Sequence, residues 1–274
     1  MKYVCGLVSY FPDEKVLSKI VDYTKSFDLI FLFDNTPSNK TEIDLKKMLR
    51  NYTNVKIIKS NENLGLSYAY SYFVSHSRKS FDFLCLLDQD SLFSDNDITN
   101  MKKFIEGQEQ REKVAIFAPK VIYSKKESIR ENSYRYTNFV ISSGSFINLA
   151  LLRNNSSLYF DKNYFIDRVD KDFCKKCIDN SYRIIVYNNS LLYQELGSSG
   201  VLRQHNYIRH YYIFRNRFYY NSKYQKWNKI ITPIQIVKQC FRILIGEDNK
   251  LKKLNQLFLA YDDFKKGLMG KGRY

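Results

Sequence analysis

Phe83-Leu-Cys-Leu-Leu-Asp-Gln-Asp-Ser91 is the stretch that decides how this chain of 274 residues folds. Its apolar part has the length and continuous hydrophobicity of a strand buried on both faces, as in the middle of a mainly parallel sheet. In open α/β sheets, ligands bind in the crevice outside the carboxyl ends of the strands. The stretch therefore predicts a buried strand that ends at a binding site.

Two carboxylates, Asp88 and Asp90, follow that strand one residue apart. In extended backbone the side chains at i and i+2 point the same way, so both can face one ligand. Like charges this close repel unless a cation lies beside them, and hard divalent ions prefer oxygen ligands together with substrate phosphates. The pair indicates a metal-diphosphate site. A solvated acidic loop is the alternative interpretation of this short pattern.

Strands and helices alternate along the first third of the chain. Apolar segments at 4–10, 29–33 and 55–58 predict further strands, and helical patterns begin near Pro12 and cover 41–50 and 66–77. Such alternation implies right-handed crossovers and a parallel sheet. The polar residues at the strand ends should then share one edge of an α/β fold; they are Ser9, Asp34, Asn63 and Asp88.

Composition indicates a globular protein, with 44% hydrophobic residues, 20 Phe and 23 Tyr. No apolar run approaches the roughly 18 residues that a membrane-spanning helix needs, and the N-terminus enters a strand without a signal peptide. We therefore expect a cytoplasmic protein. The five cysteines are scattered, which argues against a disulfide framework, and the single Cys174-x-x-Cys177 is expected in the core rather than at a zinc ion.

The last quarter of the chain carries most of the positive charge. From Arg203 to Tyr274 there are 16 Lys and Arg against four acidic residues, in a chain of formal net charge +16. This segment is also aromatic and has helical spacing, which suits an anionic membrane surface or nucleic acid. A solvated helical face is the third interpretation. We expect a domain over 1–224 and a helical, basic C-terminal extension over 225–274.

The residues at two strand ends suggest nucleotide chemistry. Asp34 is placed like the acid that binds a ribose or base in doubly wound folds. Gly65 begins a helix, where it would let backbone approach a diphosphate closely, or would serve only as a turn residue. The chain has neither a Gly-x-Gly-x-x-Gly motif nor a P-loop, so a dinucleotide fold and a P-loop enzyme are both disfavoured.

Short motifs occur along the chain in a particular order: Val8-Ser-Tyr10, Asp34-Asn35, Asn61-Glu-Asn-Leu-Gly-Leu66, Leu86-Leu-Asp-Gln-Asp-Ser91, Ser142-Ser-Gly-Ser145, Phe165-Ile-Asp-Arg-Val-Asp170 and Arg209-His-Tyr-Tyr-Ile-Phe-Arg-Asn216. Over roughly residues 3 to 220 the chain thereby resembles family 2 glycosyltransferases, and the two longer acidic motifs look most like the rhamnosyltransferase branch. The resemblance implies a GT-A fold, with helices flanking a mainly parallel sheet, a nucleotide-diphosphate sugar donor, and a divalent metal, Mg²⁺ or Mn²⁺.

The resemblance also implies roles at the donor site. It assigns Asp34 to the base or ribose, Asp88 to the ribose side of the nucleotide, and Asp90 to the metal that bridges the two phosphates. The other residues expected to contact the donor are Ser9, Asn63, Gly65 and Arg215.

Asp170 matches the family's general base, which takes a proton from the acceptor hydroxyl in a single, inverting displacement. A carboxylate suits that role when burial raises its pKa. Asp167 is the second choice for the base. Asp170 also lies near the start of an expected helix over 170–180, where an acid is stabilised by the helix dipole alone. Asp172 is expected to hold a basic partner such as Arg215.

One position departs from the family pattern. Many relatives carry a metal-binding histidine where this chain has Gln194. The amide oxygen of Gln194 can replace it, or His205 or His210 can substitute, although packing among aromatic residues is the favoured role of His210. Arg209, Arg215 and Asn216 share a helical pattern; a guanidinium there can reach a donor or lipid diphosphate, or can pair with the acids at 167–172.

The small residues of Ser143-Gly144-Ser145 precede an expected strand over 146–149. They are expected either below the acceptor site or at a close backbone contact.

The leading hypothesis is an inverting transferase that moves L-rhamnose from dTDP-rhamnose to a lipid-linked saccharide acceptor at the inner face of the cell membrane. A transferase of UDP-galactofuranose or another UDP-hexose is the alternative in the same class. A nucleic-acid-binding protein is the competing class, although nucleic acid is not expected as a partner, and an inactive homologue is the third hypothesis. The oligomeric state is open, and a homodimer is one of the states considered.

Overall fold

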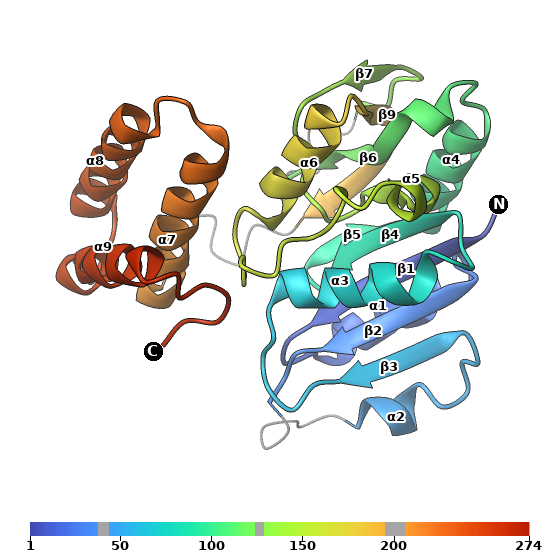
Figure 1. The fold of residues 1–274 in the computed structure, drawn as a ribbon. Helices are drawn as coiled ribbons and strands as arrows, with labels where there is room; N and C mark the ends of the chain where they lie inside the picture. Colours follow the sequence, from blue (N-terminus) through green and yellow to red (C-terminus); the bar gives the residue numbers. More distant parts are fainter. Residues whose placement is uncertain (38–43, 124–128, 195–205, 274) are drawn as a thin grey trace.

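A computed structural model describes residues 1–37, 44–123, 129–194 and 206–273. Its centre is a nine-stranded sheet, whose first half is the parallel array that the alternation predicts (Figure 1). The order there is β3-β2-β1-β4, from β1 (Tyr3–Ser9), β2 (Leu29–Asp34), β3 (Val55–Lys59) and β4 (Phe83–Asp88). The buried central strand is therefore confirmed.

The second half of the sheet is mixed. It consists of β5 (Ser91–Phe93), β6 (Val114–Ile122), β7 (Tyr134–Tyr136), β8 (Phe146–Asn148) and β9 (Arg183–Gln194). The strand β8 runs antiparallel between β4 and β6, and β6 pairs with β9 in parallel. The expected strand over 146–149 is thus present, one residue shorter, and it ends at Asn148, whose side chain caps the next helix.

Helices cover both faces of the sheet. Along β1 the side chains alternate between two hydrophobic clusters, because successive residues of a strand point to opposite faces. One cluster includes α3 and α6, and the other includes α1 and α4. Cys174 and Cys177 lie buried in the first cluster, as expected. The helices are α1 (Glu14–Tyr23), α2 (Leu45–Met48), α3 (Leu66–Ser77), α4 (Asp95–Glu106), the 3-10 turn η2 (Arg111–Lys113), α5 (Leu149–Asn154) and α6 (Val169–Asp179).

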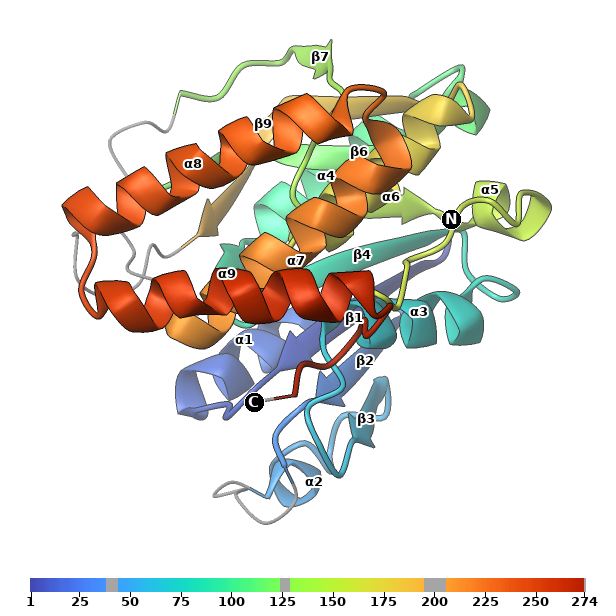
Figure 2. The same cartoon turned by 60° about the vertical axis from the view of Figure 1, so that its left-hand side comes forward.

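Three further helices form a unit of their own beside the sheet (Figures 1 and 2). They are α7 (Tyr207–Tyr224), α8 (Asn228–Gly246) and α9 (Lys250–Lys265), and we call them the helical unit. Their buried core joins Tyr211 and Phe214 of α7 to Ile243 of α8 and Ala260 of α9. Many aromatic residues of α7 are thus core residues. The boundary after residue 224 stays a prediction; in the structure α7 packs with the two helices that follow it.

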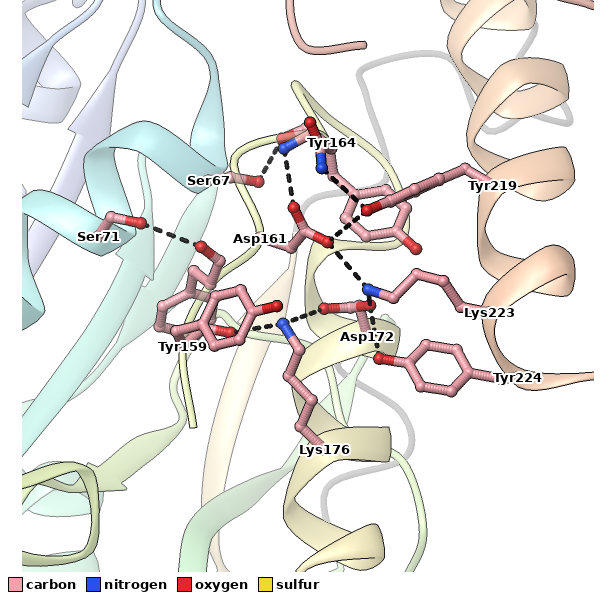
Figure 3. A network of polar contacts seen from close by, with 12 residues as sticks. Ser67, Ser71, Tyr159, Asp161, Tyr164, Asp172, Lys176, Tyr219, Lys223 and Tyr224 are labelled. Atoms are coloured by element: carbon pink, nitrogen blue, oxygen red, sulfur yellow. Dashed lines mark hydrogen bonds and ion pairs between the residues drawn. The ribbon is translucent and has the colours of Figure 1, made fainter. Parts of the chain in front are cut away.

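A polar network joins α7 to the sheet and its flanking helices, here called the sheet unit (Figure 3). Lys223 of α7 lies 2.9 Å from Asp161 and 2.8 Å from Asp172. The hydroxyls of Tyr219 and Tyr224 donate to the same two carboxylates. Asp172 holds a basic partner, as expected, but Arg215 as that partner is wrong: the partners are Lys223 and, at 2.7 Å, Lys176.

Among the described residues, no helix is both long enough and apolar enough to span a membrane.

Candidate functional site

A cavity of about 860 Å³ lies at the carboxyl edge of β1 and β4. Its lining comes from this edge, from the loop before α6, from the start of α7 and from Lys271. The structure therefore brings together residues that are far apart in the sequence. The predicted site residues that line it are Ser9, Asn63, Gly65, Asp88, Asp90, Asp167, Asp170 and Gln194.

The Asp88-Gln89-Asp90 turn is held from several sides. The side-chain amide of Gln89 accepts from the backbone N–H of Tyr10 (2.8 Å) and donates to its carbonyl (3.1 Å). The hydroxyl of Tyr70 donates to Asp88 Oδ1 at 3.3 Å, and burial raises the pKa of Tyr70 well above its usual value, so it remains a donor. The backbone N–H of Asp88 donates to Ser143 Oγ at 3.1 Å. The turn is thus fixed before any ligand binds.

Gln194 reaches this turn through strand pairing. It is the last residue of β9 and stands opposite Ser91 of β5, which follows Asp90 directly. Carboxylate and amide oxygens are the donor set that hard divalent ions prefer, so these residues fit a Mg²⁺ or Mn²⁺ ion. Within the described ranges, however, no group of three or more His, Cys, Asp or Glu is placed to hold a metal. Such an ion would depend on Asp90, Gln194 and Asp88 together with oxygens from the substrate.

Neither histidine proposed as an alternative metal ligand is seen at the cavity: His210 lies elsewhere, and His205 is not among the described residues. His210 is fully buried in the helical unit, where its Nε2 lies 2.8 Å from Glu247 Oε2. This is the packing role that the sequence favoured. His205 lies outside the described residues.

Asp34 lies beneath the cavity rather than in its lining. It is fully buried and stands opposite Ser9 in the β1–β2 register. Its Oδ1 accepts from the backbone N–H of Thr36 at 3.0 Å and from Ser9 Oγ at 3.4 Å, whereas its Oδ2 has no hydrogen-bond partner among the described residues.

Gly65 is required by geometry at the start of α3. Its φ is +81°, and a Cβ there would lie 2.4 Å from the carbonyl oxygen of Phe165. The two segments approach this closely because the N–H of Leu66 donates to that carbonyl at 2.8 Å. Asn63 Oδ1 accepts from the N–H of Gly65 at 2.9 Å. This turn therefore packs the loop before α6 against the sheet edge.

Asp167 lies on that loop and Asp170 lies in the first turn of α6, and the two acids have different surroundings. Asp167 and Arg168 both adopt left-handed φ values of 60° and 65°, which non-glycine residues rarely do. Asn216 of α7 holds this conformation by donating to the carbonyls of Ile166 (2.6 Å) and Asp167 (3.2 Å). The Asp167 carboxylate pairs with Arg209 at 3.0 Å. That ion pair is one of the two roles the sequence offered for the arginines.

Asp170 carries the perturbed carboxylate of the cavity. Burial, and then the nearby charge of Asp167, raise the pKa of Asp170 to about 6, while the N–H of Lys171 donates to it at 2.7 Å and opposes the shift. A carboxylate with such a pKa can take a proton near neutral pH. The expected helix begins at Val169, so Asp170 lies in its first turn as well.

Arg215 is not among the residues that line the cavity. Its side chain is fully buried, and it donates to Tyr211 Oη (2.8 Å), to the carbonyl of Leu268 (3.1 Å) and to the carbonyl of Gly270. Within the described part of the chain, the cations that line the cavity are Arg168, Arg209 and Lys271. Sequence reasoning missed Tyr70, Arg168 and Lys271, because no local pattern distinguishes them from other tyrosines and basic residues.

The step at Ser143-Gly144-Ser145 makes the expected close contact, and its place below an acceptor site stays a prediction. Gly144 has a φ of +78°, and a Cβ there would lie 2.8 Å from Pro119, which is a close packing contact. Ser142 lines the cavity, and Ser143 holds Asp88.

Comparison with known proteins gives consistent results. The family model Glycosyl transferase family 2 matches residues 14–178. The dTDP-rhamnosyl transferase RfbF of Shigella flexneri is 22% identical over 98% of this chain and 97% of its own length. Among solved structures, S. aureus TarS 1–349 in complex with UDP-GlcNAc has a TM-score of 0.55 at 14% identity, covering 98% of this chain and 74% of that one. GalNAc-T7 with UDP, GalNAc and Mn²⁺ has a TM-score of 0.57 at 10% identity, covering 79% and 51%.

Proposed function

The chain belongs to glycosyltransferase family 2, and from that premise we propose that it transfers a sugar from a nucleotide-diphosphate donor to a saccharide acceptor with inversion of configuration. The observation that carries the proposal is the pairing of two features in one cavity: the Asp88–Asp90 turn and the raised pKa of Asp170. The turn suits the diphosphate end of a donor, and Asp170 suits proton removal.

The proposed reaction is a single displacement. Asp170 takes the proton of an acceptor hydroxyl, the hydroxyl oxygen bonds to the anomeric carbon, and the bond from that carbon to the diphosphate oxygen breaks. Asp167 is the weaker candidate for the base because its carboxylate is held by Arg209. Asn216 fixes the backbone at Ile166 and Asp167, directly before the helix turn that carries Asp170.

We place the divalent ion of this reaction at Asp90, with Asp88 and Gln194 beside it. Bound there, Mg²⁺ or Mn²⁺ would offset the negative charge that develops on the departing diphosphate. Ser9, Asn63, Gly65 and the buried Asp34 form the edge proposed for the nucleoside end of the donor.

L-Rhamnose from dTDP-rhamnose is the proposed donor sugar, supported by the similarity to RfbF along nearly the whole chain. UDP sugars are the second candidate, because TarS and GalNAc-T7 are described with UDP compounds. A thermal-shift panel of dTDP-rhamnose, UDP-galactofuranose and UDP-GlcNAc with Mg²⁺ tests the choice, since a ligand that binds the native state raises Tm. The largest rise is expected with dTDP-rhamnose. A larger rise with a UDP sugar would favour the second candidate, and no rise with any of them would contradict the proposal.

A lipid-linked acceptor would place the enzyme at an anionic membrane surface, and α8 is the element proposed to lie on it. An apolar stripe runs along the side of α8 opposite its buried Gln239 and Ile243. Lys238 and Arg242 flank the stripe. Such a basic, amphipathic helix can lie in the plane of an anionic interface. The exposed stripe consists of Ile230 (57%), Ile234 (51%), Val237 (68%), Phe241 (63%) and Ile245 (70%).

A further inference from the structure

The segment Leu268–Arg273 after α9 turns back toward the sheet unit (Figure 2). Its Lys271 belongs to the lining of the cavity. Gly270 forms a parallel bridge with Tyr164, and its N–H donates to the carbonyl of Asn163 at 2.9 Å. The N–H of Gly272 donates to the Tyr212 hydroxyl at 3.1 Å. The segment is therefore attached to both units, although it contains neither helix nor extended strand.

Arg215 is the main support of this segment. Its guanidinium lies over the rings of Tyr211 (4.9 Å) and Tyr212 (5.2 Å) and donates to two carbonyls of the segment, those of Leu268 and Gly270. Arginine suits such a site because its planar fork can hold several acceptors at once. Further along, Arg273 pairs with the buried Asp263, which also accepts from the Tyr211 hydroxyl. These bonds fix the course of the backbone on both sides of Lys271 without using its side chain.

The backbone path of this segment places Lys271 in the lining of the cavity. Its ammonium pairs with Glu62, on the turn that leads to Asn63 and Gly65. The Lys271 and Glu62 side chains are 52% and 58% exposed, so the pair contributes little to stability and can exchange for a stronger acceptor. Of the other two cations in the lining, Arg209 pairs with Asp167, and Arg168 lies over the ring of Tyr220 at 5.2 Å. Lys271 is thus the lining cation whose partner is most readily replaced.

We propose that Lys271 binds the diphosphate of the nucleotide donor, and that Arg215 is the positioning residue that holds the segment 268–273 so that Lys271 reaches it. The inference rests on the proposed function for the presence of a nucleotide donor, and it adds a phosphate ligand from a part of the chain beyond the matched family region. A lysine ammonium is a common point-charge ligand of phosphate. On binding, the ammonium exchanges the Glu62 carboxylate for a phosphate oxygen.

Isothermal titration of the full chain with UDP and dTDP, and with uridine and thymidine, tests the role of Lys271. Lys271→Ala should weaken binding of the nucleoside diphosphate by about tenfold or more, the usual range for loss of a charge-assisted hydrogen bond, and should leave nucleoside binding unchanged. Arg215→Lys should give the same pattern to a smaller degree, with a raised KM for the donor and a nearly constant kcat. A purely structural role of either residue would weaken nucleoside and diphosphate alike.

Two variants serve as matched controls. Glu62→Gln removes the same ion pair but leaves the ammonium, so it should bind diphosphate as well as or better than the wild type. Lys266→Ala removes a lysine of similar exposure that pairs with Asp262 on α9, and it should change nothing. Two results would overturn the inference about Lys271 and leave the proposed function standing. One is equal diphosphate binding by wild type and Lys271→Ala, and the other is an equal loss of diphosphate affinity in Lys271→Ala and Glu62→Gln. A wild-type protein that binds neither nucleotide would overturn the proposed function as well.

Discussion

Asp170 and Asp167 differ in what surrounds them more than in where they stand in the sequence. Arg209 holds the charge of Asp167, whereas Asp170 has no such ion pair among the described contacts and its pKa is raised to about 6. Asp170→Asn should therefore reduce the transfer rate by about 10²- to 10⁴-fold, the usual contribution of a general base, and leave the Kd of the donor within about twofold. Single-turnover transfer assays and titration measure the two effects. An equal loss of rate from Asp167→Asn, with full activity of Asp170→Asn, would move the base to Asp167.

The same pKa predicts a pH dependence. The base must be ionised, so kcat/KM should rise about tenfold per pH unit below about pH 6 and level off above it. Because the folded pKa lies above the ordinary value of 3.8, ionisation of Asp170 weakens folding as the pH rises from about 4 to 6. Asp170→Asn should accordingly raise Tm at pH 7, measured by calorimetry. A lower Tm would contradict the burial argument.

A substitution at Asp90 tests the proposed metal site. Asp90→Ala should abolish the dependence of donor binding on Mn²⁺, because the remaining oxygens of Asp88 and Gln194 are too few to hold the ion. Titration of the donor with and without Mn²⁺ measures it. Gln194→Ala is the companion variant and should weaken Mn²⁺ binding, since it removes the amide oxygen from the proposed donor set. Unchanged Mn²⁺ dependence in Asp90→Ala would remove Asp90 from the site.

At the scale of an element, composition alone does not show that α8, rather than α7, carries the exposed apolar residues. The sequence suggested a membrane surface, nucleic acid or solvent as the surroundings of the basic, aromatic last quarter, yet many aromatics of α7 are buried core. Pro233 lies inside α8, yet the helix continues past it to Gly246 and keeps its exposed stripe.

Ile234→Glu with Phe241→Glu should release the protein from anionic vesicles, because each charge removes apolar contact and repels the anionic headgroups. Sedimentation with phosphatidylglycerol vesicles measures the bound fraction, with Ile129→Glu, at another exposed apolar residue (69%), as the control. Circular dichroism checks the fold. Unchanged vesicle binding together with loss of a dimer in sedimentation velocity would show instead that α8 is an interface between two copies of the chain.

At the scale of the whole molecule, the network around Lys223 holds the helical unit on the sheet unit (Figure 3). Asp161 and Asp172 are both buried, and Lys223 lies between them. Burial alone would raise the pKa of Asp161, but the bonds from Lys223, Asn163 and Tyr219 outweigh it and lower that pKa. The cavity is built from both units, so the site depends on this interface.

Lys223→Met should destabilise the protein by about 2–4 kcal/mol, because it leaves two buried carboxylates without their shared cation. Lys175→Met is the control: its pair with Asp179 is exposed, and its loss should change stability by less than about 1 kcal/mol. Urea unfolding at pH 7 measures both. Equal effects of the two substitutions would mean that the interface does not depend on Lys223.

The sequence by itself determined the first four strands, the alternation of strands and helices around them, and the residues of the sheet edge. Apolar runs and strand-helix alternation predict β1 to β4, and the order of short motifs identifies the family, because both kinds of information are local in the chain. Ser9, Asn63, Asp88 and Asp90 then fall at one edge by the geometry of parallel strands. The side chains that hold these residues in place come from distant parts of the sequence, and no sequence pattern predicts them.

Only the tertiary structure decided which partner each charge takes. Lys223 rather than Arg215 reaches Asp172, Arg215 holds the segment 268–273, and Lys271 arrives at the cavity from the far end of the chain. Gln194 comes beside Asp90 through the pairing of β5 with β9. Such contacts join residues separated by tens to hundreds of positions, and they depend on how the two units pack. A basic residue in a lysine-rich segment could pair with many acidic residues, and the packing of the two units decides which of them lies within reach.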